Sequence, residues 1–319
     1  MITLDDVQAA RARLDGVAFH TPPIALPRRK NEPHVWFKPE NLQPIGAFKI
    51  RGAYNRIAAI PEAQRAAGVI AYSSGNHAQG VAYAARLLNI PAVIVMPNNA
   101  PAVKIAATRA YGANVVLYDP ATESREVVAA RLMEGKAWTL VPPFNDPYVI
   151  AGQGIIGLEI FEDLPEVDLI LVPVGGGGLI SGIAAAIKSL KPSVRVIGVE
   201  PELANDAQRS LHDGHIVTIT QAEAVRTIAD GVRTLSVGDL TLAHLQRFVD
   251  DILTVNEAEI RKATRRLILR SKLVAEPAGA LPFAAYLYHR DQLPQARTIV
   301  LIVSGGNIDP ALLAQLIRR

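Results

Sequence analysis

Short apolar runs alternate with longer amphipathic segments over most of the chain. Apolar runs of about five residues rich in β-branched side chains are typical of strands buried on both faces, whereas apolar residues at helical spacing indicate helices. The predicted strands are 68–72, 92–96, 115–118, 169–174, 194–199 and 298–303. The predicted helices include 78–88, 102–111 and 124–132. Asn256 followed by Glu259 indicates the start of a further helix, because the two side chains can cap its first turn.

This alternation predicts an α/β fold of parallel sheets with right-handed crossovers. The turn-rich segment 141–147 interrupts the alternation and suggests two sub-domains, each a parallel sheet between two layers of helices. We expect residues 1–60 and 146–319 to form the larger sub-domain and residues 61–145 the smaller one. Ligands of such sheets bind at the carboxyl ends of the strands. The loops after the strands that end at 72, 174 and 303 are therefore the places where a site is expected.

One of these loops consists of four consecutive glycines between a buried strand and a helix. Without Cβ atoms, successive backbone amides can point into one concavity and bind an anion, helped by the N-terminus of the helix. A tight turn needs fewer glycines, so the pattern favours a phosphate site. It is neither a dinucleotide fingerprint nor a P-loop, because G-x-G-x-x-G and Gly-Lys-Ser/Thr are both lacking. The four residues are Gly175, Gly176, Gly177 and Gly178.

The loops after the first and last of these three strands carry small polar residues. Residues 73–77, Ser-Ser-Gly-Asn-His, offer hydroxyls, an amide and free backbone N–H groups, a set that suits a carboxylate or an oxygenated ring. Ser304 follows the last strand. Its hydroxyl can either cap the next turn or donate a hydrogen bond to a ring nitrogen, and both interpretations remain open.

Lys49 lies between the bulky apolar residues Phe48 and Ile50, within a segment bounded by Gly46 and Gly52. An amine held against apolar groups loses solvation, which disfavours its charged form. A neutral amine is what a Schiff base with an aldehyde requires. The alternative is a surface lysine whose stem covers a buried Phe. The segment alone does not decide between the two.

An acidic loop at 200–206 is the other candidate site. Glu200 and Asp206, with a backbone carbonyl between them, would offer oxygen ligands to Mg²⁺ or Ca²⁺. Considered alone, the residues favour a solvated acidic loop over a metal site.

Composition narrows the class of protein. Of 319 residues, half are hydrophobic and a fifth are charged, as expected for a compact enzyme. No apolar run reaches the roughly 18 residues of a membrane span, and no signal peptide is evident at the N-terminus. The absence of cysteine excludes disulfides and thiolate metal sites, and we expect a cytoplasmic protein. The net charge is only +3, and the basic clusters at 28–30 and 261–272 have few aromatic neighbours, so we expect no nucleic-acid partner.

Taken together, these segments resemble the fold-type II enzymes that depend on pyridoxal 5′-phosphate (PLP), in the branch of serine/threonine dehydratases and serine racemases. The resemblance extends from Thr21 to Asn307. The motifs that carry it are K-P-E-N-L-Q-P-I-G-A-F-K-I-R-G-A, S-S-G-N-H-A-Q-G, M-P-N-N-A-P-A-V-K, P-V-G-G-G-G-L-I-S-G, T-I-A-D-G-V, A-E-P-A-G-A and S-G-G-N. The fold implied is that of the tryptophan synthase β-subunit, in which the larger sub-domain, 1–60 and 146–319, would bind PLP and the smaller one, 61–145, would close over the substrate.

The resemblance also implies roles for individual residues around the cofactor. Lys49 would hold PLP as a Schiff base and later remove the substrate α-proton. Asn76 would bond the ring hydroxyl and Ser304 the pyridine nitrogen, while the glycine loop would hold the phosphate. The other residues implied to lie near the cofactor are Phe48, Leu179, Gly231 and Glu276.

A second group of implied roles concerns the substrate and a metal. Ser73, Asn76 and His77 would form the loop that binds the substrate carboxylate. Ser74 matches the serine that acts as acid and base on the opposite face of Cα in racemases, and Arg125 matches a position near the substrate side chain. The metal ligands implied are Glu200, the carbonyl of Ala204 and Asp206, and this match shifts the acidic loop in favour of a divalent cation such as Mg²⁺.

The activity implied is the elimination of water from L-threonine or L-serine to give a 2-oxo acid and ammonia, by a homodimer or homotetramer. Three alternatives remain open. Ser74 would suit a serine racemase, Arg125 would suit 3-hydroxyaspartate, and a phenylserine-type dehydratase is also compatible. A catalytically silent PLP-binding sensor is the alternative from another class.

Overall fold

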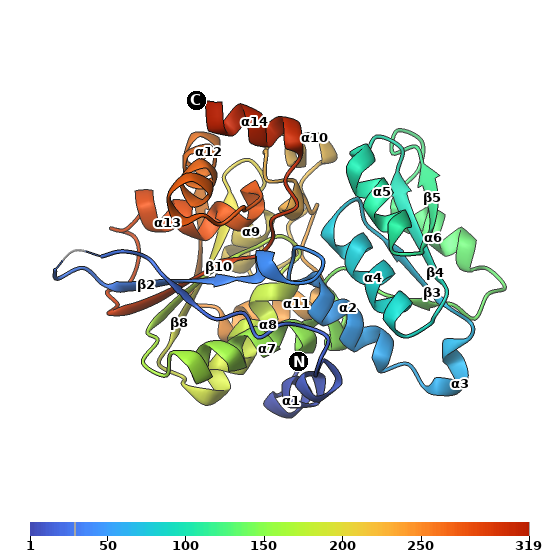
Figure 1. The fold of residues 1–319 in the computed structure, drawn as a ribbon, viewed down its shortest axis with the longest axis horizontal. Coiled ribbons are helices and arrows are strands. Elements are labelled where there is room, and N and C mark those ends of the chain that lie inside the picture. The colour runs from blue at the N-terminus through green and yellow to red at the C-terminus, as the bar shows by residue number, and fades with distance from the viewer. Residues whose placement is uncertain (29, 319) are drawn as a thin grey trace.

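The protein is built on two β-sheets that lie side by side and are covered by helices (Figure 1). The computed structural model describes residues 1–28 and 30–318. The larger sheet has the strand order β1-β2-β10-β7-β8-β9, and all its neighbouring strands are parallel except β1 and β2. Its strands are β1 (Ile24–Ala25), β2 (His34–Pro39), β7 (Leu169–Pro173), β8 (Arg195–Pro201), β9 (Asp251–Val255) and β10 (Thr298–Val303).

The smaller sheet is parallel throughout and has the order β5-β4-β3-β6. Its strands are β3 (Val69–Tyr72), β4 (Ala92–Pro97), β5 (Asn114–Tyr118) and β6 (Thr139–Leu140). The helices that accompany it in the sequence are α3 (Glu62–Arg65), α4 (Asn76–Leu87), α5 (Ala102–Ala110) and α6 (Arg125–Met133). We refer to residues 61–145 as the smaller unit and to the remainder as the larger unit, and these boundaries stay predictions.

The larger unit contains the remaining helices, and some of them cover the two faces of its sheet. They are α1 (Leu4–Arg13), α2 (Lys49–Ala58), α7 (Pro147–Asp163), α8 (Gly178–Leu190), α9 (Asp206–Asp213), α10 (Gln221–Ala224), α11 (Asp239–Phe248), α12 (Glu257–Arg266), α13 (Leu281–Tyr288) and α14 (Pro310–Arg318). Short 3₁₀ turns η1 (Glu40–Leu42), η2 (Asp230–Val232) and η4 (Pro277–Ala280), and a π-helical turn η3 (Leu267–Ser271), complete the assignment.

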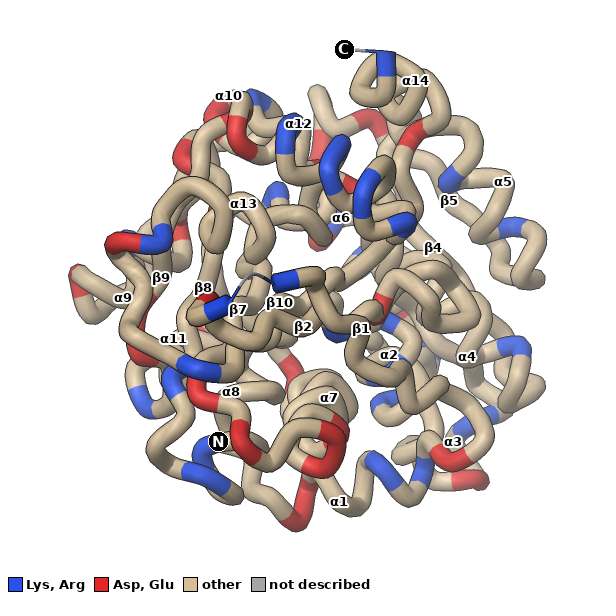
Figure 2. Tube along the Cα trace, turned by 60° about the vertical axis from the view of Figure 1, so that its left-hand side comes forward, with Lys and Arg blue, Asp and Glu red and all other residues tan. Residues whose placement is uncertain are grey.

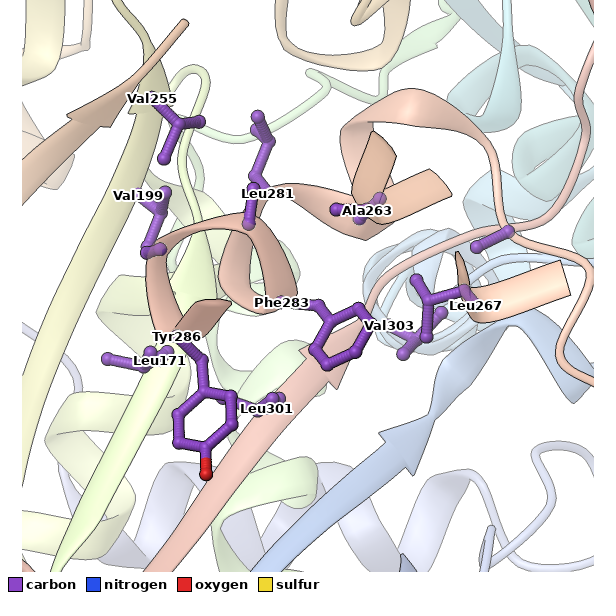
Figure 3. Packing of buried hydrophobic residues seen from close by; sticks show 14 of the residues in the cluster. Leu171, Val199, Val255, Ala263, Leu267, Leu281, Phe283, Tyr286, Leu301 and Val303 are labelled. Carbon is purple, nitrogen blue, oxygen red and sulfur yellow. The ribbon is translucent and has the colours of Figure 1, made fainter. Parts of the chain in front are cut away.

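The apolar runs in the sequence are continuous because the central strands are buried on both faces. In β7, Leu171 packs in a cluster with Phe283 and Leu301 on one face, while Ile170 and Val172 belong to the cluster on the other face. Figure 3 shows the first of these clusters, in which side chains of α13 lie against the sheet. The parallel α/β fold class is thereby confirmed.

Helix α2 joins the two units. Its residues Ile50, Ala53 and Ile57 pack in the core of the smaller sheet. Its opposite side contacts α7, where the amide of Gly52 donates to the side chain of Gln153 at 3.2 Å. The residue that begins this helix, Lys49, therefore lies where the units meet.

The predicted helix start at Asn256 is confirmed. The side chain of Asn256 accepts from the amide of Glu259 at 3.1 Å, and the carboxylate of Glu259 accepts from the amide of Asn256 at 2.9 Å. Ile260, Ala263 and Leu267 of this segment are buried, whereas most of its basic side chains are exposed. The basic positions near α12 are blue in Figure 2. Of the other basic cluster, Arg29 lies outside the described residues. No helix in the described part of the chain is long and apolar enough to cross a membrane.

Candidate active site

The loops expected to form a site line one cavity at the carboxyl ends of β3, β7 and β10. The predicted cofactor and substrate residues all line it. They are Phe48, Lys49, Ser73, Ser74, Asn76, His77, Arg125, Gly175, Gly176, Gly177, Gly178, Leu179, Gly231, Glu276 and Ser304. Glu200, Ala204 and Asp206 lie elsewhere, at the end of β8 and the start of α9.

Lys49 is the first residue of α2, and its side chain enters this cavity. Its Nζ donates to the carbonyl of Pro143 at 2.6 Å and lies 5.1 Å from the centre of the Phe48 ring. Burial of the amine and, second, the positive charge of Arg125 lower the pKa of Lys49 to about 8. The amine is therefore far more often neutral near pH 8 than an ordinary lysine would be.

The backbone ties the Lys49 segment to the loop after β10. The amide of Phe48 donates to the carbonyl of Ser304 at 3.1 Å, and the amide of Gly306 donates to the carbonyl of Gly46 at 2.9 Å. These bonds join residues more than 250 positions apart in sequence. They hold Lys49 and Ser304 on the same wall of the cavity.

A buried ion network fixes the rest of α2. Arg51 is 1% exposed and binds Glu40 at 2.7 Å and Glu159 of α7 at 2.6 Å. Lys38 of β2 also binds Glu159, at 2.6 Å. Buried charges need partners of this kind, because desolvation is not otherwise compensated. The network holds the helix that begins with Lys49 against α7 and β2.

The glycine loop has the geometry of an anion site. Gly177 has φ +86°, a left-handed conformation that favours glycine, and α8 starts at Gly178 without a side-chain cap. A Cβ on Gly176 would lie 2.2 Å from the ring of Phe144, so only glycine fits beneath that ring. First-turn amides and the helix dipole favour a phosphate there. Together with the low-pKa lysine, this cradle fits PLP.

Asn76 and Glu276 meet on another side of the cavity. The amide nitrogen of Asn76 donates to Glu276 Oε1 at 2.6 Å, and its oxygen accepts from the side chain of Asn307 at 2.9 Å. Glu276 is 2% exposed and its Oε2 atom is buried without a partner. Burial, followed by the negative charge of Asp230, raises the pKa of Glu276 to about 7. A carboxyl in this state can donate as well as accept a proton near neutral pH.

The low pKa of His77 makes its ring neutral near pH 7. Its Nε2 lies 2.8 Å from the carbonyl of Val141, which identifies Nε2 as the protonated nitrogen. Burial and then the charge of Lys49 lower the pKa of His77 to about 3. In the same loop, Ser73 Oγ accepts from the amide of Gly75 at 3.2 Å, whereas Ser74 is exposed.

Arg125 enters the cavity from the start of α6. Its guanidinium lies 5.2 Å from the centre of the Tyr72 ring, and its Nε donates to Glu126 at 2.7 Å. The side chain keeps 33% of its surface exposed. It is therefore a partly exposed cation in the lining of the cavity, paired with Glu126.

Several lining residues were not identified from the sequence. Phe144 covers the glycine loop, and Thr234 has a buried hydroxyl without a partner. Lys104 and Asp230 form an ion pair beside them. Both residues belong to motifs that carry the family resemblance. Their contact could not be inferred from a single sequence, because they lie 126 positions apart.

The acidic loop contains two buried carboxylates. Glu200 accepts from the amides of Ala207 at 3.1 Å and Gln208 at 2.7 Å, whereas both oxygens of Asp206 are buried without a partner. Burial raises the pKa of Asp206 to about 7, and burial with the neighbouring charge of Asp206 raises the pKa of Glu200. The burial of both carboxylates, and the lack of any partner for Asp206, contradict the solvated loop that the residues alone favour. They fit a hard cation.

Comparison with known proteins gives a consistent result. The model of the family "Pyridoxal-phosphate dependent enzyme" matches residues 15–305. An L-threo-3-hydroxyaspartate ammonia-lyase of Saccharomyces cerevisiae is 44% identical over 99% of this chain and 96% of its own. An L-threonine ammonia-lyase of Thermotoga maritima is 45% identical over 100% of this chain and 79% of its own.

Solved structures agree with the sequence relatives. A maize serine racemase superposes with a TM-score of 0.92 at 39% identity, covering 99% of this chain and 97% of the other. The expected family and its PLP cofactor are thereby confirmed. The chain belongs to the pyridoxal-phosphate dependent enzymes, with the fold of serine racemase and of the ammonia-lyases.

Proposed function

We propose that the protein eliminates water from a β-hydroxy amino acid, L-threonine or L-serine, to give a 2-oxo acid and ammonia. The observation that carries this proposal is the buried Lys49 amine of lowered pKa, in one cavity with a glycine loop at a helix N-terminus. PLP, when bound, supplies the electron sink that stabilises the carbanion formed when Cα loses its proton.

The residues around the cavity would have different roles in binding the cofactor and in proton transfer. Lys49 would hold the cofactor covalently, and the neutral form of its freed Nζ would take the proton from Cα. The amides of the glycine loop would hold the phosphate, with Phe144 packed over them. Ser304 would meet the pyridine nitrogen, Asn76 would bond the ring hydroxyl, and Phe48, Leu179, Gly231 and Glu276 would line the ring.

The loop after β3 would bind the substrate carboxylate. It combines the Ser73 hydroxyl with the backbone N–H groups at the start of α4, and both would donate to an anion. The neutral His77 would line this loop, with its Nε2 held by the carbonyl of Val141. The positive charge of Arg125 adds to this attraction. The side chain of the substrate would then extend toward Arg125.

A divalent cation, Mg²⁺ being the first candidate, would be held by Glu200, Asp206 and the carbonyl of Ala204. The two unpaired oxygens of buried Asp206 support this assignment. In the described part of the chain, no group of three or more acidic, His or Cys side chains could hold a metal, so water and carbonyl oxygens would complete the coordination.

A substrate panel tests the proposed elimination. The PLP-loaded protein is incubated separately with L-threonine, L-serine, L-threo-3-hydroxyaspartate and L-phenylserine, and both 2-oxo acid and D-amino acid are measured. We expect 2-oxo acid from L-threonine or L-serine. A protein that binds PLP but forms D-amino acid without 2-oxo acid would be a racemase, and one that forms neither product would be a sensor. Either result would show that the proposal is wrong.

Racemisation is a second candidate activity, favoured by the hydroxyl of Ser74 in the same cavity as Lys49. A racemase needs an acid or base on each face of Cα. If Ser74 has that role, Ser74→Ala should abolish D-serine formation while elimination persists. Equal loss of both products would assign Ser74 to substrate binding instead.

Arg125 favours a substrate with a second carboxylate, such as 3-hydroxyaspartate. Arg125→Met should raise KM for L-threo-3-hydroxyaspartate at least about tenfold more than KM for L-threonine. An equal change for both would leave Arg125 as a residue that binds the α-carboxylate. Assembly into a homodimer or homotetramer and a cytoplasmic location stay expectations from the sequence, and light scattering tests the first.

A further inference from the structure

Lys104 and Asp230 form an ion pair across the active-site cavity. Lys104 belongs to α5 of the smaller unit, and its Nζ contacts Oδ2 of Asp230 in η2 of the larger unit. Lys104 is only 6% exposed, although it carries a charge, whereas the Asp230 side chain is 35% exposed. None of the roles described above requires this contact.

Lys104 lies beside one loop that lines the site, and Asp230 belongs to another. On one side, a Cβ built on Gly75 would lie 3.8 Å from Lys104 Nζ, so the ammonium lies against the loop proposed to bind the substrate carboxylate. On the other side, Asp230 directly precedes Gly231. The η2 turn is held in place by Arg233, whose Nε donates to the carbonyl of Thr227 at 2.9 Å. The ion pair thus connects a substrate loop of one unit to a cofactor loop of the other.

We propose that the Lys104–Asp230 ion pair is a latch that holds the two units closed around the amino acid, which makes both side chains positioning residues for the reaction. The amino acid as the enclosed ligand rests on the proposed function, whereas the ion pair between the two units does not depend on it. Closure matters because the site is complete only when the two loops meet, and because a closed site excludes water from the reacting atoms.

The kinetic consequence follows from the population of the closed state. For a ligand that binds only the closed form, the apparent Kd equals the intrinsic Kd divided by the fraction of molecules that are closed. Breaking the latch lowers that fraction in the ligand-free protein. Saturating substrate restores closure through its own contacts, so KM should rise while kcat changes little.

Three variants test the latch with the PLP-loaded protein: Lys104→Met, Asp230→Asn and the double variant. Each single change should raise KM for the preferred substrate about tenfold and leave kcat within about threefold. Both single variants break the same contact. The KM of the double variant should therefore be no higher than that of the more impaired single variant. Arg131→Met is the matched control, since Arg131 pairs with Glu123 on the surface of the smaller unit, and its KM should not change.

A rival explanation is that the two residues act through the pKa of Glu276, and it predicts opposite effects of the two variants. Asp230 raises the pKa of Glu276 and Lys104 lowers it, so variants acting through Glu276 would move the pH profile of kcat/KM in opposite directions. A latch predicts the same direction of change in KM for both. Opposite changes in KM, or a double variant whose loss is the product of the two singles, would overturn the proposal.

Hydrogen exchange tests the latch without any reaction. In cofactor-free protein, amides of residues 73–76 and 230–234 should exchange about fivefold faster in either single variant than in wild type or Arg131→Met. Unchanged exchange in both segments would overturn the latch. A wild-type protein that fails to bind PLP would overturn the proposed function instead, and this exchange measurement would still decide the latch.

Discussion

Lys49 acquires its chemistry from neighbours that lie far from it in the sequence. Its flanking residues Phe48 and Ile50 leave two interpretations open, a surface lysine or a Schiff-base amine. The fold resolves this ambiguity by burying the amine and placing Arg125 near it, and both effects lower the pKa. The glycine loop, the loop at 73–77 and Ser304 were predictable because each follows a strand. The charges that set the pKa values of the site residues were not predictable, since they depend on contacts between elements.

The pKa of Lys49 predicts how fast the cofactor-free protein takes up PLP. Only the neutral amine reacts with an aldehyde, so the rate should rise with pH and level off above about 8 rather than near the ordinary lysine value of about 10.4. Growth of the visible cofactor band after mixing measures this rate. Arg125→Met removes a charge that lowers the pKa, and the plateau should then begin at higher pH. A profile with its midpoint near that of a free lysine would contradict the assigned pKa.

At the scale of elements, the strands with continuous apolar runs were predictable and the others were not. β7, β8 and β10 are buried on both faces and lie within two residues of their predicted bounds. β2 was missed because it carries His34 and the fully buried Lys38, whose charge is compensated by Glu159 of α7. β9 begins with Asp251 and has only three buried residues, so its apolar pattern is weak.

The ion network beneath α2 predicts that two glutamates of α7 contribute very differently to the free energy of unfolding. Glu159→Ala leaves buried Lys38 and Arg51 without this partner and should lower the free energy of unfolding by about 3–5 kcal/mol. Glu162→Ala removes only an exposed partner of Arg11 and should cost less than about 1 kcal/mol. Urea unfolding of both variants gives the comparison. Similar losses would mean that the network does not hold α2.

On the scale of the whole molecule, two sheets meet at one cavity while a second polar site lies apart from it. The presence of two sheets could be anticipated from the turn-rich segment at 141–147, whereas the bounds of the two units stay a prediction. The packing of α2 into both units could not be anticipated. In the sequence, a helix with one apolar and one ionic face is an ordinary amphipathic helix. The acidic loop joins β8 to α9 within the larger unit, so a cation there would act on the stability of that unit.

Metal binding at the acidic loop should be visible in thermal unfolding. Mg²⁺ at about one hundred times its Kd adds about 2.7 kcal/mol of stability, which corresponds to about 5 °C in Tm. Asp206→Asn should remove this gain and should stabilise the EDTA-treated protein, because it removes a buried, unpaired carboxyl group. Glu202→Gln, a change at an exposed neighbour, is the control. A wild-type Tm that is the same in Mg²⁺, Ca²⁺ and EDTA would contradict the metal site.

The identity of the cofactor lysine is the central claim, and covalent trapping tests it most directly. The PLP-loaded protein is reduced with borohydride, digested and analysed by mass spectrometry, so that the cofactor stays on the amine that held it. We predict the mass of one reduced cofactor on the peptide that contains Lys49, and no such adduct in Lys49→Ala. An adduct on Lys104 or another lysine, or none in the wild-type protein, would contradict the account.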